Sequence, residues 1–158
     1  MSGTRRIALQ GPLGTATLVE GEVRGFETAN AAIDVEHLRL DVPLSGRLKL
    51  ENATLLFAGR RCVRAEGRVA TDILTQAMDG PEVSGTLACA GDAAVARLEG
   101  RMQDLQVDVA LRLDAAGQYQ VQTRVASANP MVRNTLALAG FAENGDGLLR
   151  SDEGTLGL

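Results

Sequence analysis

The sequence has few aromatic residues. It contains no tryptophan, one tyrosine and three phenylalanines, so aromatic residues make up 3% of the chain. Aromatic side chains anchor sugars, bases and tight protein interfaces, and the sequence offers little of that surface. Apolar residues still make up 45% of the chain, and a chain of this length can bury a core. That core must be built mainly of Leu, Val and Ala.

Clusters of basic residues are also missing. The 16 Lys and Arg residues are scattered, the longest runs are Arg5-Arg6 and Arg60-Arg61, and the net charge is −4. Nucleic-acid binding requires a stripe of positive charge, so we predict no nucleic-acid partner. No segment approaches the roughly 20 apolar residues of a transmembrane helix, and no signal peptide opens the chain. We expect one domain over residues 1–158, and we expect any membrane anchor to precede Met1.

Residues typical of catalysis are scarce. His37 is the only histidine, whereas acid–base and nucleophilic machinery usually requires a histidine with an oriented partner. No catalytic or phosphate-binding motif is present. Asn144, Asp146 and Glu153 have part of the spacing of a calcium loop. Ala142 occupies the first ligand position of that loop, so we predict a polar turn, with no metal, no cofactor and no enzyme activity.

The two cysteines, Cys62 and Cys89, lie 27 positions apart. Neither belongs to a CxxC motif or has a histidine close by in the sequence, which argues against a zinc site. The residues alone leave two alternatives, a disulfide or two buried thiols.

Alternation of apolar and polar residues is the dominant pattern, and it is typical of half-buried β-strands. It is clearest over residues 104–113 and 118–125, which flank the turn-forming tetrapeptide Asp114-Ala-Ala-Gly117. We predict a β-hairpin here with one apolar face. The members of this candidate apolar sheet face are Leu105, Val107, Val109, Leu111, Leu113, Val121 and Val125.

Shorter runs predict further strands, separated by glycine-containing turns. These strands cover residues 7–10, 15–19, 22–26, 33–42, 48–50, 54–57, 63–69, 83–89 and 94–98. The alternation changes register near Glu36 and His37, which predicts a β-bulge there.

Two segments have helical patterns. Asn129, Pro130 and Gly140 suit the N-cap, the first turn and the C-terminal cap of a helix. A shorter helix is predicted over residues 71–78. The predicted fold is therefore mainly β, an antiparallel meander of short strands forming a curved sheet or partly open barrel, with one or two short helices.

The order of several motifs resembles a known family. Residues 83–92 read VSGTLACAGD, and the predicted hairpin follows them through Gly117-Gln118-Tyr119. A helix that ends at Gly140-Phe141 and a closing Gly154-Thr155-Leu156 come next. This order over about residues 61–156 is similar to type II secretion system protein N, whereas the first 60 residues match only in style.

The resemblance implies a non-enzymatic structural component of a secretion machine that docks to other secretion-system proteins. It implies a location on the periplasmic side of the inner membrane, with an anchor in a missing N-terminal segment. It also implies a disulfide between Cys62 and Cys89, because that family pairs two such cysteines.

A periplasmic lipid-binding or lipid-transfer module is the alternative. A curved sheet lined by Leu and Val can shelter acyl chains, and the candidate apolar sheet face has that composition. If helices cover this face, it is a protein core instead.

Overall fold

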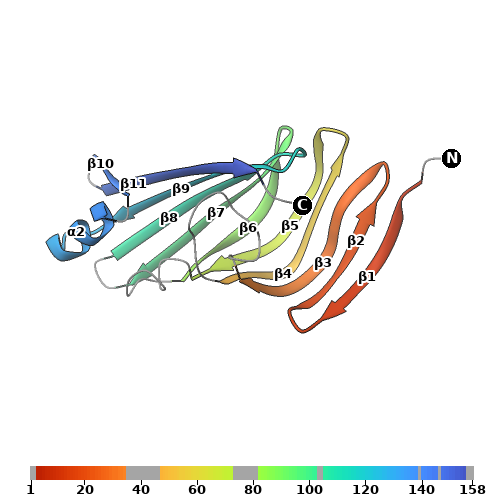
Figure 1. Cartoon of the computed structure of the whole chain (residues 1–158), viewed down its shortest axis with the longest axis horizontal. Helices are drawn as coiled ribbons and strands as arrows, with labels where there is room; N and C mark the ends of the chain where they lie inside the picture. Colours follow the sequence, from red (N-terminus) through yellow and green to blue (C-terminus); the bar gives the residue numbers. More distant parts are fainter. Residues whose placement is uncertain are drawn as a thin grey trace.

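The computed structural model describes residues 3–34, 47–72, 82–102, 105–138, 140–145 and 147–155. These residues form one antiparallel, unclosed sheet of eleven strands in the order β1 to β9, then β11 and β10 (Figure 1). The strands are β1 (Arg5–Gly11), β2 (Gly14–Glu20), β3 (Val23–Asp34), β4 (Arg47–Ala58), β5 (Arg61–Thr71), β6 (Val83–Ala90), β7 (Ala93–Met102), β8 (Leu105–Leu113), β9 (Gln118–Ala126), β10 (Ala142–Asn144) and β11 (Gly147–Thr155). The predicted antiparallel meander is confirmed.

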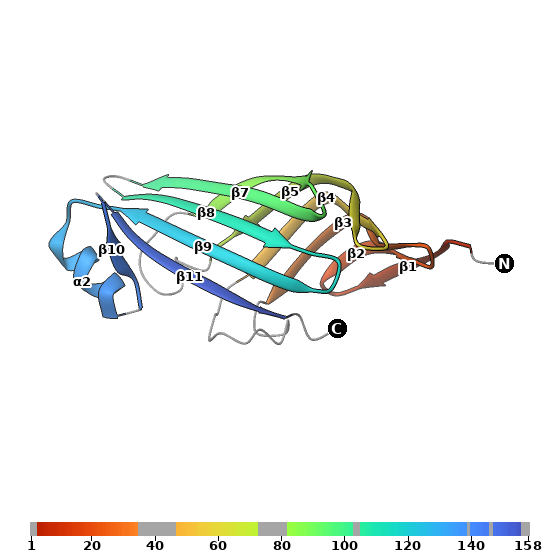
Figure 2. The same cartoon turned by 90° about the horizontal axis from the view of Figure 1, so that it is seen from above.

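The sheet is curled, as the view from above shows (Figure 2). Leu55 and Phe57 of β4 belong to the same apolar cluster as Leu113 of β8. Three strands separate β4 from β8 in the sheet, so these side chains can meet only if one face folds inward. We call this the inner face. On the opposite, outer face, Asp108 lies directly across from Arg124.

The two ends of the sheet differ. Four short connections, at 21–22, 59–60, 91–92 and 114–117, lie at one end, which we call the tight-turn end, whereas the β1–β2 turn at 12–13 lies at the other. Both ends of the described chain lie at the tight-turn end, since Arg5 pairs with Glu20 and Thr155 pairs with Gln118. The helix α2 (Pro130–Leu138) lies at the other end (Figures 1 and 2).

The caps of α2 are as predicted. The amide of Met131 donates to Oδ1 of Asn129 at 3.0 Å, so Asn129 is the N-cap. At the other end, Gly140 has a positive φ of 93°, and its amide and that of Phe141 donate to carbonyls in the last turn of the helix. Leu136 is the buried residue of the helix.

A row of bulges crosses β2 to β5. Register shifts interrupt three neighbouring ladders, at Thr15/Thr17, between Phe26 and Ala31, and at Glu51/Thr54. Bulges increase the local bend and twist of a sheet, and Figure 1 shows β3 and β4 bending along their length. The row therefore accounts for the curvature of this half of the sheet.

Side-chain oxygens accept hydrogen bonds from backbone amides that lose their strand partners at the bulges. The amide of Thr28 donates to Oγ1 of Thr54, and that of Asn52 donates to Oδ1 of Asn30, both at 3.0 Å. Thr28 and Asn52 each have a φ of 48°, in the left-handed region. Asparagine tolerates that conformation better than most residues.

Several sequence predictions need amendment. The strands predicted at 48–50 and 54–57 are one strand, β4. The strand predicted at 22–26 merges in β3 with the first two residues of the one predicted at 33–42, whose remainder lies outside the described residues. The helix predicted over 71–78 does not begin at Thr71, which ends β5, and residues 73–80 lie outside the described residues. Glu36 and His37, where a bulge was predicted, also lie outside the described residues. The polar segment after Asn144 was predicted only as a turn, yet Gly147–Thr155 forms strand β11.

Gly67 gives a test of the bulge row. Its φ is 99°, and a Cβ there would lie 2.4 Å from the carbonyl oxygen of Asn52. We expect Gly67→Ala to lower the free energy of unfolding by more than about 2 kcal/mol in urea titrations followed by circular dichroism. Gly59 is the matched control, because its φ is 61° and a Cβ would meet nothing within 4 Å. Equal losses for the two variants would contradict this account.

Candidate functional site

The candidate apolar sheet face lies on the inner face of β8 and β9. The register places Val107 opposite Val125 and Leu111 opposite Val121, so these side chains share one side of the sheet. Leu105, Val107, Val109 and Val125 are buried, whereas Leu111, Leu113 and Val121 are partly buried. The hairpin predicted from the alternation is therefore present, and its apolar side is inward.

A protein core covers much of this face. The apolar cluster that contains Val107 and Val125 also contains Leu136 of α2, Leu148 of β11, and Phe141, which lies between α2 and β10. The α2 helix thus closes the inner face at its own end of the sheet. The described part of β8 near Leu105 is packed against protein and is not open to a ligand.

A second apolar cluster lies toward the tight-turn end. Leu55, Phe57 and Ala94 are buried there, with Phe26 and Leu113 packed against them. Arg24 of β3 reaches across the inner face and donates to the carbonyl of Ala115 in the β8–β9 turn at 3.1 Å and to that of Gly59 at 3.3 Å. Sequence patterns did not single out Arg24, because its partners are backbone carbonyls distant in the chain.

The ladder between β5 and β6 is short. These strands have 11 and 8 residues, yet they share only the four pairs from Arg68↔Thr86 to Thr71↔Val83. By contrast, β7 and β8 pair from Ala94↔Leu113 to Met102↔Leu105. This ladder joins one half of the sheet, β1 to β5, to the other half, β6 to β11. Its backbone hydrogen bonds therefore cover only part of the length of β5 and β6.

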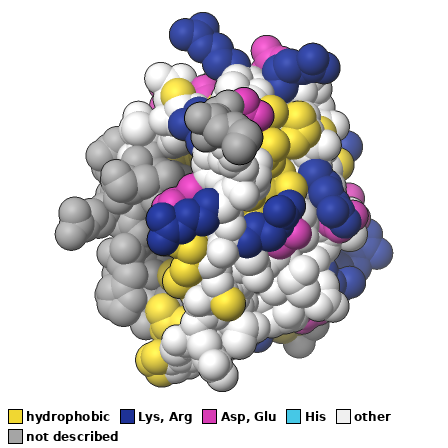
Figure 3. All heavy atoms as spheres, turned by 90° about the vertical axis from the view of Figure 1, so that its right-hand side faces the viewer, with side chains coloured by type: hydrophobic (Ala, Val, Ile, Leu, Met, Phe, Trp, Pro, Cys, Tyr) yellow, Lys and Arg dark blue, Asp and Glu magenta, His cyan; other side chains and the backbone are white. Residues whose placement is uncertain are grey.

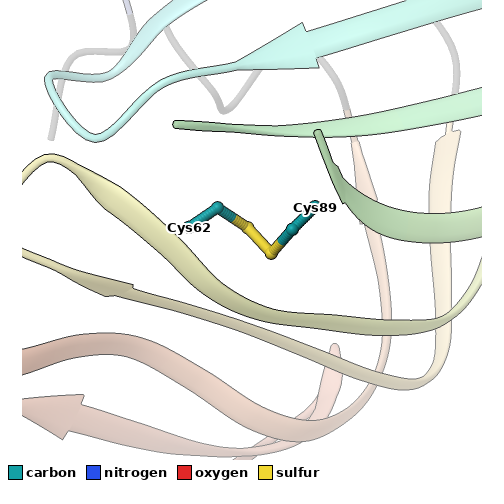
Figure 4. The surroundings of a disulfide bond; sticks show 2 residues. All are labelled: Cys62 and Cys89. Atoms are coloured by element: carbon teal, nitrogen blue, oxygen red, sulfur yellow. A yellow bond between two sulfur atoms is a disulfide. The ribbon is translucent and has the colours of Figure 1, made fainter. Parts of the chain in front are cut away.

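A disulfide joins the two strands where their ladder has ended. Cys62 of β5 is bonded to Cys89 of β6, with their Cα atoms 5.6 Å apart (Figure 4). Cys62 pairs with Phe57, and Cys89 pairs with Ala94. Because Phe57 and Ala94 are members of the second apolar cluster, the disulfide fixes β5 and β6 beside it. This is the pairing that the family resemblance implied.

No cluster of residues that could bind a metal occurs in the described ranges. Groups of three or more His, Cys, Asp or Glu side chains in metal-binding arrangement are absent from them. Asn144 ends β10 and Gly147 begins β11, so these residues flank a hairpin turn. Glu153 is exposed on β11.

No strand among the described residues lies along the outer edge of β1. β1 lies at one end of the strand order and pairs only with β2. All but one of its residues are exposed, Ile7 being intermediate. Figure 3 looks onto this side of the molecule, where patches of apolar side chains alternate with Lys and Arg side chains.

The family model for type II secretion system (T2SS) protein N matches residues 2–151. The chain belongs to this family. Comparison with curated proteins and with solved structures returned no significant match. This T2SS protein N chain matches its family from residue 2 onward, so the similarity includes β1 to β4. The sequence motifs had predicted the resemblance only from about residue 61, with no specific motif in the first 60 residues. In the described ranges, α2 is too short and too polar to cross a bilayer.

The disulfide leads to a stability prediction. We expect Cys62→Ala/Cys89→Ala to unfold with a free energy about 3–4 kcal/mol lower than the native protein, because the cross-link restricts the unfolded chain. Urea unfolding at pH 7 with and without reductant measures the difference, and reductant should not affect the double variant. Two free thiols titrated in denatured, unreduced protein made in the periplasm would contradict the disulfide.

Proposed function

We propose that this T2SS protein N chain is a non-enzymatic accessory component of a type II secretion system. In this proposal it forms one domain on the periplasmic side of the inner membrane, held there by an N-terminal anchor that precedes residue 1, and docks to other inner-membrane or periplasmic components. The family match over residues 2–151 carries the proposal, since it makes the chain a component of that machine.

The disulfide supports the periplasmic location. Disulfides persist in oxidising compartments such as the bacterial periplasm and are rare in the cytosol. Here the bond between Cys62 and Cys89 joins the two halves of the sheet beyond a ladder of four residue pairs. The bond therefore cross-links β5 and β6 where the two strands have no backbone pairing.

The character of the two faces supports a structural role. Side chains on the inner face pack into two apolar clusters. Charged side chains on the outer face form exposed pairs, such as Lys49 with Glu82 at 3.0 Å and Arg6 with Glu27 at 2.7 Å. Catalysis requires polar groups that converge in a sheltered place, and neither arrangement provides that in the described residues.

The open sheet supports docking by strand edges. An unpaired edge presents backbone donors and acceptors to which another chain can add a strand. The described sheet has two such edges, β1 along seven residues and β10 along three.

A lipid-binding or lipid-transfer module is the second candidate. The observation in its favour is that Leu111, Leu113 and Val121 remain partly exposed on the inner face. Against it, the neighbouring Val107 and Val125 are fully buried against protein. We therefore propose that the inner face is mainly a core.

Secretion by whole cells tests the proposed function. We expect deletion of the gene to reduce the amount of T2SS substrate in the medium and to raise the amount retained in the periplasm, measured by quantitative immunoblotting. A plasmid copy should restore secretion. A copy carrying His37→Ala should restore it equally well, because we assign no chemistry to the only histidine. Undiminished secretion in the deletion strain would count against the proposal.

Native mass spectrometry separates the two candidates. We expect protein purified from the periplasm to carry no stoichiometric lipid, because protein side chains fill much of the inner face. A bound lipid that is lost in Leu111→Glu, but kept in the matched variant Arg112→Glu on the outer face, would establish lipid binding instead. Circular dichroism checks that both variants are folded.

A further inference from the structure

The hairpin of β1 and β2 determines which backbone groups of β1 face outward. The amide of Ala32 donates to the carbonyl of Leu13 at 2.9 Å. This bond flanks the pair Gly14↔Ala31, so Gly14 directs its own amide and carbonyl away from β3 and toward Gly11 of β1. Gly11 and Gly14 are thus a hydrogen-bonded pair.

Hydrogen-bonded and non-hydrogen-bonded pairs alternate along an antiparallel ladder. The β1–β2 register is continuous from Arg5↔Glu20 to Gly11↔Gly14. It follows that the N–H and C=O groups of Arg6, Ala8 and Gln10 point out of the sheet, where none of the described strands pairs with them.

β1 has little of the protection that edge strands usually have. Charged side chains, bulges, proline and covering segments commonly block the pairing of edges. The charged side chains of β1 are confined to its first two residues, Arg5 and Arg6. The β1–β2 ladder has no register shift, and the nearest proline, Pro12, lies in the turn. Leu9 is 48% exposed, so an apolar side chain is also available beside the free backbone groups.

We propose that β1 pairs antiparallel with β1 of a second copy of this chain, with Ala8 opposite Ala8 of that copy. The two sheets would then form one continuous sheet about a two-fold axis. This inference rests on the geometry of the edge and does not depend on the secretion role.

The side chains of β1 fit this register. Ile7 lies opposite Leu9 of the second copy, so the apolar inner faces of the two sheets become continuous. On the outer face Arg6 lies opposite Gln10 of the second copy, which can accept its hydrogen bond, and Arg6 can keep its bond to Glu27. Arg5 lies opposite Gly11, which has no side chain to oppose it.

The charges favour the register centred on Ala8 over a shifted register of the two copies. Arg5 and Arg6 are the only charged residues of β1, and both lie at its start. The two-fold pairing separates Arg6 of one copy from Arg6 of the other by four residues along the strand, about 13 Å. A two-fold register centred on Arg6 would place like charges directly opposite, which destabilises a sheet.

The pairing involves one short strand and therefore buries less than a standard interface. The dimer is accordingly concentration-dependent, and a cross-link is the sharpest test. The native chain has two cysteines, both in the disulfide, so Ala8→Cys introduces a single free thiol. Under a mild thiol oxidant we expect Ala8→Cys to give a disulfide-linked dimer on non-reducing gels. Arg5→Cys is the matched control on the same strand, because its thiols would lie about 20 Å apart, and we expect no dimer.

A second pair of variants tests the register without a new thiol. We expect Gln10→Glu to strengthen dimerisation about three- to tenfold in sedimentation equilibrium, because each new carboxylate faces Arg6 of the other copy. Gln10→Arg should weaken it by a similar factor. Circular dichroism confirms that each variant is folded.

Three results would overturn the proposal. One is a native protein that stays monomeric at millimolar concentration, and another is cross-linking of Arg5→Cys equal to that of Ala8→Cys. The third is protection of the β1 amides from hydrogen exchange only when other secretion components are added, which would assign the edge to a different protein's strand.

Discussion

The structure depends on how β5 and β6 are held together. Ladders of backbone hydrogen bonds join β1 to β5 on one side and β6 to β11 on the other, but only four residue pairs connect the two halves. The disulfide between Cys62 and Cys89 provides the second point of attachment. These two attachments act together with side chains that pack between the halves in both apolar clusters, such as Val69 with Val83 and Phe57 with Ala94.

The angle between the two halves determines whether the inner face can be buried. The second apolar cluster contains Phe57 from one half and Ala94 from the other, and the bond from Arg24 to Ala115 also joins the two halves. At the opposite end α2 and Phe141 pack onto the other cluster. A chain with so few aromatic residues thus builds its core by curling an aliphatic sheet, with asparagine-supported bulges providing the bend.

The sequence predicts features that depend on neighbouring residues. Alternation at residues 105–125 identifies the hairpin, and Asn129 and Gly140 identify the ends of α2, because both signals are local. The bulges at Thr28 and Asn52 could not be predicted, because a bulge exists only relative to its partner strand. β11 was missed because its charged and glycine residues, such as Asp152, Glu153 and Gly154, obscure the alternation. Periodicity finds the apolar face, but which residues cover it depends on tertiary packing.

The position of the chain ends has a mechanical consequence. Both ends of the described chain lie at the tight-turn end of the sheet, while α2 lies at the opposite end with Met131 and Leu138 exposed by 77% and 90%. If this protein is attached through either terminus, the attachment therefore holds the sheet at its tight-turn end only. The disulfide cross-links the sheet between β5 and β6, and α2 lies at the end farthest from the attachment. Force applied at α2 would run lengthwise along β9 and β11 to a C-terminal attachment, whereas to reach an N-terminal attachment it would have to cross the ladders of the whole sheet from β11 to β1.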